Sequence, residues 1–422
     1  MPARVERATR AAVPVGPAGS HRQHKDRPLQ ASLYRDGRYP AGPKGPAVCH
    51  ITTVHQPFDT RIFHKECVSL ARAGYDVHLV ACHDRDEVVD GVRIHALPRP
   101  PGRLRRMLCW PWRAVAVARG IRPRPAVYHI HDPELLPAAQ ALRLGGERVI
   151  FDVHENIAAD ILYKPYWSPG VRRAVSWAYR QAERLLTAGL PTVHVLAEIA
   201  RTYCGRRVVV RNLPLRRQID ESTAEAAGPP PHRHRLVYLG VVSTERGAGT
   251  MLEVMRRLLG RGVDCELVVV GPVHEAHLAE RLTDEAASDD LAGRVILRGA
   301  LPYPAAMAEV KAADLGLCLF HPVPNNLTSL PNKLLEYLSM GTAVVASDFE
   351  CWRPYVRGTG GGIQVDPLDP VQIADGIEDL LRRPRQVRRM GELGRAAVRE
   401  RLCWEVEQEK LLALYRSLAG PP

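Results

Sequence analysis

The sequence predicts an α/β protein built from two Rossmann-like, doubly wound units. Short β-rich runs alternate with helical stretches, a pattern typical of parallel sheets with helices on both faces. The 422 residues exceed what one hydrophobic core usually organises, and a proline- and charge-rich passage at 212–235 interrupts the alternation. Because ligands of open parallel sheets bind beyond the carboxyl ends of the strands, we expect the two units to face a central cleft that holds the site.

The first half of the chain starts its regular pattern with an apolar strand at 47–54. Apolar residues at helical spacing from Ile62 to Ala71 predict a helix that ends at Gly74. Further strands are predicted at 76–82, 92–97, 126–130, 149–153 and 192–196.

The second half repeats the alternation around a helix predicted at 250–259. Its strands are predicted at 236–241, 265–270, 295–297, 315–320 and 343–346. The predicted organisation is a disordered basic tail at 1–45, a first domain at 46–210, a linker at 211–233, a second domain at 234–400 and a closing helical segment at 401–422. Whether the closing segment returns to the first domain stays open at this point.

Composition narrows the class of protein. The net charge of +12 favours anionic partners such as nucleotide phosphates, acidic lipid surfaces or nucleic acid. The nine cysteines never form a Cys-x-x-Cys pair, so neither a disulfide framework nor a zinc site is predicted. No apolar run reaches the length of a membrane span, and we expect a cytoplasmic protein, with peripheral contact at the inner face of the cell membrane as an open alternative.

The most informative segment, 330–346, reads as a loop, a helix, a glycine stop and a strand. Pro331 suits a first helical turn, whose free amides can bind a phosphate. Glu336 lies about one turn further on, where it could accept hydrogen bonds from ribose hydroxyls, and Lys333 lies on roughly the same face. The alternative is a solvated helix with a surface lysine and glutamate, but the loop follows an apolar strand, which favours a ligand site.

This segment resembles the nucleotide-binding region of family 4 glycosyltransferases, whose two-domain fold is called GT-B. Other blocks resemble the family in matching order, over about 47–405: 55–63 (HQPFDTRIF), 128–134 (YHIHDPE), 151–155 (FDVHE) and 210–212 (VRN). The resemblance implies transfer of a sugar from a nucleotide-diphosphate sugar, such as a UDP-sugar, to an acceptor hydroxyl with retention of configuration. It implies no protein nucleophile, no cofactor and no metal. Where the family carries the first of two paired glutamates, this chain has Thr328, while Glu336 matches the second.

The resemblance also implies residues for the donor side. Arg246 follows the strand of a segment, 238–247, that resembles the family's basic phosphate-binding loop, and its guanidinium fork suits a diphosphate. The nucleotide is predicted to be approached by the backbone of Ser329, Leu330 and Gly299. Lys333 is predicted on the same donor side. The alternative for Arg246 is an exposed arginine at a helix entry.

On the other side, His131 closes a predicted strand and matches a family histidine near the reaction centre, so we predict a catalytic role, whereas His129 is expected to be deeper and structural. Asp59 is either a second catalytic residue, orienting the acceptor hydroxyl, or a helix cap. Arg61, His154 and Glu155 are predicted on the acceptor side, with packing roles as the alternative.

Two competing functions share some of these features. A nucleotide-sugar epimerase could use the same fold but would need acid and base carboxylates around the sugar, and a basic nucleic-acid-binding protein would fit the charge alone. The stretch 103–113 interleaves arginines with large apolar residues and could contact an anionic membrane, or form an ordinary amphipathic helix broken at Pro111. The expected partners are a nucleotide sugar and a glycan, lipid-linked or small-molecule acceptor, and no nucleic acid.

Overall fold

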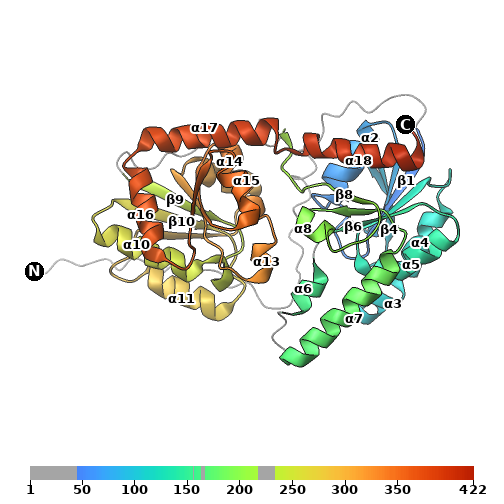
Figure 1. Ribbon diagram of the computed structural model, residues 1–422, viewed down its shortest axis with the longest axis horizontal. Coiled ribbons are helices and arrows are strands. Elements are labelled where there is room, and N and C mark those ends of the chain that lie inside the picture. The colour runs from blue at the N-terminus through green and yellow to red at the C-terminus, as the bar shows by residue number, and fades with distance from the viewer. Residues whose placement is uncertain (1–44, 155, 163–166, 217–232) are drawn as a thin grey trace, which may run out of the picture. The chain divides into compact units, whose positions relative to one another are not determined.

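The computed structural model describes residues 45–154, 156–162, 167–216 and 233–422 (Figure 1). The described chain forms two compact units. The first unit comprises 45–215 together with 403–422, and the second comprises 216–402. The predicted tail lies outside the described residues except for Gly45, as does most of the predicted linker.

The first unit is built on an eight-stranded sheet with the order β3-β4-β2-β1-β5-β6-β7-β8. All neighbouring strands pair in parallel except β3 and β4, which are antiparallel. The bounds are β1 Ala47–Ile51, β2 Asp76–Cys82, β3 Glu87–Val89, β4 Val92–Leu97, β5 Val127–Ile130, β6 Val149–Val153, β7 Thr192–His194 and β8 Arg207–Val209. The sequence pattern predicted six of these strands but neither the short β3 nor β8.

The helices of the first unit include an irregular one beside the central strands. Residues 62–72 form a π-helical turn followed by an α-helix, because the backbone hydrogen bonds widen before Val68. The bounds are η1 Ile62–Cys67, α2 Val68–Arg72, α3 Arg103–Leu108, α4 Trp110–Gly120, η2 Pro133–Leu135, α5 Leu136–Leu144, α6 Ile157–Ile161, α7 Pro169–Thr187, α8 Ala197–Ala200 and α18 Trp404–Ala419.

The carboxyl-terminal helix α18 is part of this first unit. Its Trp404 and Tyr415 are buried in the same core as Val48 of β1 and Phe63 of η1. The indole of Trp404 donates to the hydroxyl oxygen of Ser69 at 2.8 Å. The closing segment therefore completes the core of the unit that begins more than 300 residues earlier in the chain.

The second unit has a six-stranded, fully parallel sheet with the order β11-β10-β9-β12-β13-β14. Its strands are β9 His234–Leu239, β10 Cys265–Val270, β11 Val295–Gly299, β12 Leu315–Cys318, β13 Ala343–Ser347 and β14 Gly362–Val365. Its helices are η3 Thr244–Arg246, α10 Ala248–Gly260, α11 Ala276–Ala286, α12 Tyr303–Lys311, α13 Pro324–Leu327, α14 Asn332–Met340, η4 Glu350–Trp352, α15 Arg353–Val356, α16 Pro370–Leu381 and α17 Pro384–Glu400.

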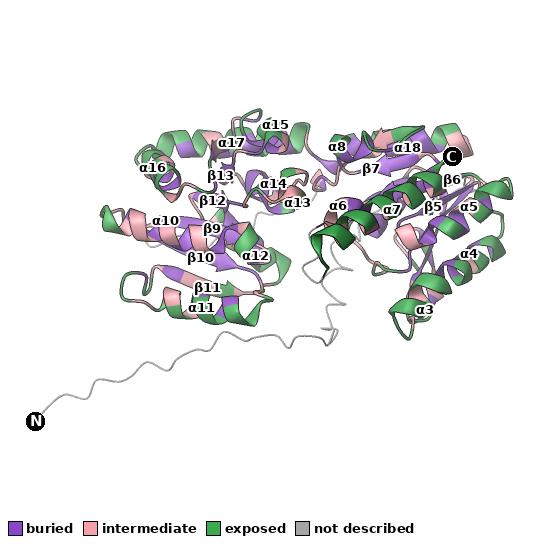
Figure 2. Cartoon of the chain, turned by 60° about the horizontal axis from the view of Figure 1, so that its bottom comes forward, coloured by how far each residue is buried: buried purple, intermediate pink, exposed green. Residues whose placement is uncertain are grey.

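Both units therefore confirm the prediction of parallel, doubly wound sheets. Figure 2 shows the strands of each sheet buried and the outward faces of the helices exposed. Within the described ranges, none of the helices combines the length and the apolar character needed to cross a membrane.

The predicted break of the helix at Pro111 needs correction. The helical stretch is interrupted earlier, at Cys109, and Pro111 lies in the first turn of α4. Proline is tolerated there because the first amides of a helix have no intrahelical acceptor.

Candidate functional site

Three glycines lie at the carboxyl ends of adjacent strands in the second unit. Gly240 follows β9, Gly271 follows β10 and Gly299 ends β11, and all three have positive φ angles. The amide of Gly240 donates to the carbonyl of Val270 and that of Gly271 to the carbonyl of Gly299, at 2.7 and 2.8 Å. A Cβ at Gly271 would lie 2.1 Å from the carbonyl oxygen of Gly240, so only glycine fits. The strand ends thus present bare backbone, which lets a ligand approach closely.

Lys333, in the first turn of α14, extends toward these strand ends. A Cβ at Gly240 would lie 3.5 Å from its Nζ, and Nζ lies 3.7 Å from the ring centroid of Tyr238 and 4.8 Å from that of Phe320. The side chain is buried, and its ammonium has no hydrogen-bond acceptor among the described residues. Two aromatic faces stabilise a cation but satisfy none of its three N–H donors.

The electrostatics of Lys333 follow from this environment. Burial, assisted by the positive charge of Arg246, lowers the pKa of Lys333 to about 7, although Cys318 and Glu336 oppose the shift. The ammonium is therefore only half formed near neutral pH without a ligand. An anion placed at Nζ would restore the full charge, as a phosphate-binding lysine requires.

Arg246 lies on the loop that follows β9. Its Nη1 donates to the carbonyl of Val241 at 3.1 Å, and its guanidinium carbon lies 5.6 Å from the ring centroid of Phe320. Phe320 thus contacts both cations, Arg246 and Lys333. The following residue, Gly247, has a left-handed conformation and would clash with the carbonyl of Leu319 if it carried a Cβ. The structure thus brings Arg246 and Lys333 to one aromatic side chain.

The loop before α14 is held by its backbone. The carbonyl of Ser329 accepts a hydrogen bond from the indole of Trp352 at 2.6 Å, and Leu330 next to it is half-buried. Thr328, which replaces the first carboxylate of the resembling family, donates to the carbonyl of Pro324 at 3.0 Å and so closes α13. Pro331 is the N-cap of α14, one residue before the predicted helical position.

Glu336 is half-buried one turn into α14, close enough to Lys333 to influence its charge. Tyr337 beside it is a residue that sequence reasoning missed. Its hydroxyl accepts from the amide of Leu239 at 2.8 Å and donates to the carbonyl of Leu317 at 3.2 Å. It therefore joins β9 and β12, whose main-chain pairing ends earlier at Gly316, and fixes the strand end below Lys333.

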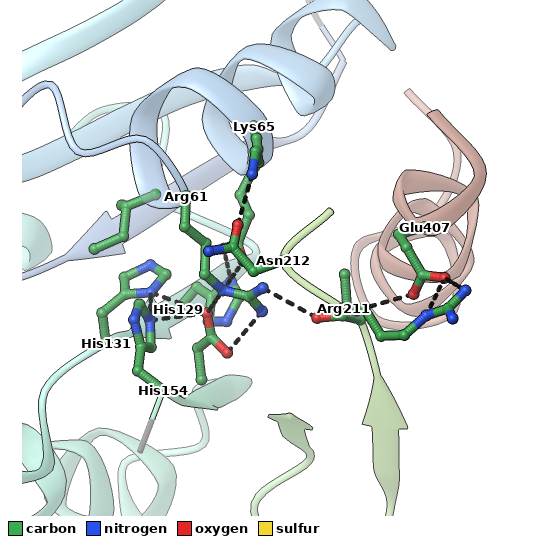
Figure 3. Close-up of polar contacts among 12 residues, drawn as sticks. Arg61, Lys65, His129, His131, His154, Arg211, Asn212 and Glu407 are labelled. Carbon is green, nitrogen blue, oxygen red and sulfur yellow. Dashed lines mark hydrogen bonds and ion pairs between the residues drawn. The ribbon is translucent and has the colours of Figure 1, made fainter. Parts of the chain in front are cut away.

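The first unit contains a separate buried polar network centred on Asp152 of β6 (Figure 3). Arg61 donates from Nε and Nη2 to the two carboxylate oxygens of Asp152, at 2.9 and 3.1 Å. Its Nη1 donates to the carbonyl of Val210 at 3.0 Å. Although burial opposes ionisation, the guanidinium of Arg61 holds the pKa of Asp152 well below its usual range. This pair is a permanent buried charge pair rather than a surface contact.

His131 and His154 share the same carboxylate. Nε2 of His154 lies 3.0 Å from Oδ2 of Asp152, and Nδ1 of His131 lies 3.4 Å from it. The other nitrogen of His131, Nε2, lies 2.9 Å from Nδ1 of His50, so both of its ring nitrogens are engaged inside the unit. Burial lowers the pKa of His131, and its side chain has no exposed surface, whereas His154 is 18 % exposed. In this arrangement His154 is the member of the network that reaches the surface.

Asp59 acts as the cap of η1. Its Oδ1 accepts from the amides of Arg61 and Ile62 at 2.8 and 2.9 Å. Burial opposes ionisation, but His55 and the two amides together hold the pKa of Asp59 well below its ordinary value. Its second oxygen faces His55, whose ring nitrogen lies 3.8 Å away. Capping therefore accounts for Oδ1 of Asp59, whereas Oδ2 faces the partly exposed imidazole of His55.

The block at 210–212 ties the first unit together. Lys65 donates to the side-chain oxygen of Asn212 at 2.6 Å, and Arg211 forms an ion pair with Glu407 of α18 at 2.6 Å (Figure 3). Glu155, predicted on the acceptor side, lies outside the described residues. Asp152 lies in the segment 151–155, which resembles the family, but it was not predicted as a site residue. An aspartate inside an apolar strand nevertheless indicates a buried charge that needs a partner.

Two known family models match the chain, one in each of its two units. Residues 233–383 match a family model described as glycosyl transferases group 1. Residues 60–216 match a model described as a glycosyl transferase 4-like domain. The two matches fall on the second and the first unit respectively.

Curated relatives match part of the chain. A phosphatidyl-myo-inositol mannosyltransferase of Mycobacterium tuberculosis is 28 % identical over 205 residues, covering 47 % of this chain and 51 % of that protein. An alpha-D-kanosaminyltransferase of Streptomyces kanamyceticus is 24 % identical over 183 residues, covering 43 % and 45 %. The chain thus matches about half the length of these relatives.

Solved structures match over nearly the whole chain. A sucrose-phosphate synthase from Thermosynechococcus elongatus superimposes with a TM-score of 0.70 at 17 % identity, covering 88 % of this chain and 99 % of that chain. Anabaena HepE, solved in complex with UDP and glucose, gives a TM-score of 0.64 at 12 % identity, covering 88 % and 100 %. At such identities the likeness establishes the GT-B fold alone. With both family models, it shows that this chain belongs to the group 1 glycosyltransferases of the family 4-like type.

Proposed function

We propose that the protein transfers a sugar from a nucleotide-diphosphate sugar to an acceptor hydroxyl, with retention of anomeric configuration. The observation that carries the proposal is Lys333, a buried ammonium without an acceptor beside the glycine-lined strand ends and close to Arg246. A buried cation in need of anionic oxygens, next to backbone that tolerates close approach, suits a diphosphate.

Each donor-side residue has a defined task in this proposal. Lys333 and Arg246 stabilise the negative charge that develops on the diphosphate as the sugar leaves. Glu336 accepts hydrogen bonds from the ribose, and the backbone near Gly299, Ser329 and Leu330 borders the nucleotide. Thr328 closes α13 instead of contacting the donor sugar, which leaves the sugar to other groups.

Retention follows from front-face attack in this proposal. The acceptor oxygen bonds to the anomeric carbon on the face from which the diphosphate departs, and the acceptor proton passes to a diphosphate oxygen. No covalent enzyme intermediate is needed. On the acceptor side, His154 and Asp59 carry the exposed polar atoms, while His131 and Arg61 hold the Asp152 carboxylate that orients His154.

Peripheral membrane contact is a second element of the proposal, and α3 supports it. All six of its residues lie outside the core, and Leu104 and Leu108 are 75 % and 68 % exposed. Arg103 and Arg105 are exposed on the same short helix. Exposed leucines between arginines fit an anionic lipid surface, which would bring the enzyme to a lipid-linked acceptor.

The nucleotide test comes first. A thermal-shift panel of UDP, GDP, ADP and their sugar conjugates should show stabilisation by one nucleotide class, because a ligand of the native state raises its stability. Lys333→Met should abolish this shift, whereas Lys311→Met, at an exposed lysine of the same unit, should preserve it. Absence of any response in the wild-type protein would refute the donor assignment.

The reaction test uses the nucleotide found. Proton NMR of the product with a simple acceptor gives the anomeric configuration directly, and an inverted product would refute retention. Conversion of the sugar nucleotide into an isomer without transfer would instead favour an epimerase. For the membrane element, Leu104→Ser with Leu108→Ser should reduce binding to phosphatidylglycerol vesicles, with Leu144→Ser as the control at an exposed leucine outside α3.

A further inference from the structure

A cluster of metal-ligating side chains lies buried in the first unit, next to the Asp152 network. His50, Glu66, His129 and His131 each offer one donor atom, and these four atoms all lie within 4.8 Å of one another. We propose that these four residues hold a divalent transition-metal ion, zinc by preference, as a structural centre of the first unit. The proposal is independent of the transferase activity.

The strand register places the three histidines together. His50 of β1 is paired with His129 of the neighbouring strand β5. His131 follows two residues later, and because side chains alternate along a strand it faces the same side of the sheet as His129. The π-helical turn η1 packs over this side and carries Glu66 into the cluster. Such π-helical turns are frequently found at functional sites.

Two atoms in the cluster have no hydrogen-bond partner among the described residues, Oε2 of Glu66 and Nε2 of His129, and both side chains are fully buried. The other carboxylate oxygen of Glu66, Oε1, lies 3.0 Å from Nε of Arg61. Oε2 of Glu66 lies 4.0 Å from Nδ1 of His50 and 3.9 Å from Nδ1 of His129. These separations are too long for hydrogen bonds. Leaving a buried carboxylate oxygen without a partner is costly, so the arrangement calls for a cation.

The donor spacing suits a small tetrahedral ion. With metal–ligand distances of about 2.0–2.1 Å, the donors of a tetrahedral zinc site are about 3.3 Å apart. The distance of 2.9 Å between Nδ1 of His50 and Nε2 of His131 and the distance of 4.0 Å between Nδ1 of His50 and Oε2 of Glu66 lie on either side of this value. Small side-chain rotations would bring the four donors to a common centre.

The outer contacts are those of metal ligands. Nε2 of His50 lies 2.9 Å from the hydroxyl of Tyr415, Nδ1 of His131 lies 3.4 Å from Oδ2 of Asp152, and Oε1 of Glu66 lies 3.0 Å from Nε of Arg61. Each of these three ligands therefore has one polar atom in contact with a residue outside the cluster, while its other polar atom faces the centre of the cluster. Metal-bound histidines typically have such a partner on the second nitrogen, which fixes ring orientation and raises basicity.

The hydroxyl of Tyr415 also lies 2.9 Å from Nδ1 of His129. When His129 binds the ion, the hydroxyl keeps its contact with His50. Three imidazoles and one carboxylate favour zinc over magnesium or calcium, which prefer oxygen ligands. The second possible group, His131 with Asp152 and His154, is less suitable because Arg61 already occupies both oxygens of Asp152.

The competing arrangement has no ion and places a proton between Glu66 and Asp152. Metal content separates the two. Protein purified without a histidine tag or chelator should contain about one zinc per chain by elemental analysis. After exchange for Co²⁺, the visible spectrum should show the intense d–d bands of tetrahedral coordination by nitrogen and oxygen. Removal of the ion should lower the melting temperature, and one equivalent of Zn²⁺ should restore it.

Variants locate the site. Glu66→Gln should lose the bound ion, whereas His194→Ala, at a buried histidine of β7 bonded to Thr192, should retain it. Tyr415→Phe should keep one ion per chain but bind it about 10- to 100-fold more weakly. The wild-type measurements need no variant to fold. Wild-type protein without a transition metal that also fails to bind Co²⁺ would overturn the proposal, as would unchanged metal content in Glu66→Gln.

Discussion

The pKa of Lys333 predicts that binding of the proposed diphosphate ligand weakens as pH rises through the weakly alkaline range. The free protein holds the pKa of Lys333 at about 7. A bound diphosphate raises that pKa because it supplies the negative charge that the buried ammonium lacks. Below pH 7 the ammonium is already present, so affinity is maximal there. Above pH 7 the protein must take up a proton to bind, and affinity falls.

The size of the effect follows from the fraction of protein that carries the ammonium. If the bound pKa returns to about 10, affinity falls about 20-fold between pH 7.5 and pH 9, or about 2 kcal/mol. The diphosphate group is almost fully ionised over this range. Neighbouring groups do not titrate there, because burial raises the pKa of Cys318 to about 12 and raises that of Tyr238 beyond the range, while arginine stays charged. The slope therefore reports on Lys333.

Isothermal titration calorimetry measures both parts of the prediction. The dissociation constant should rise with pH as calculated, and near pH 8 binding should take up close to one proton, seen as different heats in buffers of different ionisation enthalpy. Lys333→Met should bind weakly at every pH with no proton uptake, and Lys311→Met should behave as wild type. An affinity that is flat from pH 7.5 to pH 9, or the same slope in Lys333→Met, would refute the reasoning.

Three further substitutions test individual contacts. Tyr337→Phe should lower the free energy of unfolding by about 1–3 kcal/mol in urea titrations, since the amide of Leu239 loses its buried acceptor; an unchanged midpoint would contradict the strand-joining role. Asp152→Asn should cost about 3–5 kcal/mol, because the Arg61 guanidinium keeps its charge without a counter-ion, and a smaller loss would mean that Glu66 replaces it. Asp59→Ala should cost about 1 kcal/mol at neutral pH. Because the folded pKa of Asp59 is lowered, this difference is complete above the unfolded pKa of about 3.9 and should be lost progressively as pH falls from there through the lower folded pKa.

The sequence predicted most of the regular elements because their signals are local. Apolar runs such as 76–82 and 265–270 coincide with β2 and β10, and the end of α14 at Gly341 follows from a glycine that adopts a left-handed conformation. The three-residue strands β3 and β8 escaped prediction, because such short segments are stabilised by their neighbours rather than by their own pattern. The π-helical geometry of η1 likewise depends on packing.

The relative position of Lys333 and Glu336 was predictable for a related reason: both lie within one short helix, and spacing alone puts them on one face. The two rings over which the ammonium of Lys333 lies belong to Tyr238 and Phe320, at two other strand ends. No sequence pattern near Lys333 predicts that these rings lie there. The lowered pKa of Lys333 arises from burial and from the nearby charge of Arg246, which only the fold brings about, so the sequence could propose a cation but not its protonation behaviour.

The histidine cluster shows the limit most clearly. The spacing of His129 and His131 predicted that both lie on one side of the sheet with His129 deeper, and the structure buries both. The partner that contacts His129 is Tyr415, 286 residues further along the chain. Helix α18 supplies this hydroxyl, part of the hydrophobic core and, through Glu407, the counter-ion of Arg211. A fragment that ends at residue 215 would therefore lack part of its own core and one contact to His50. Any dissection of the first unit must keep residues 403–422 attached, because without them the proposed metal site loses the hydroxyl of Tyr415 and the unit loses part of its core.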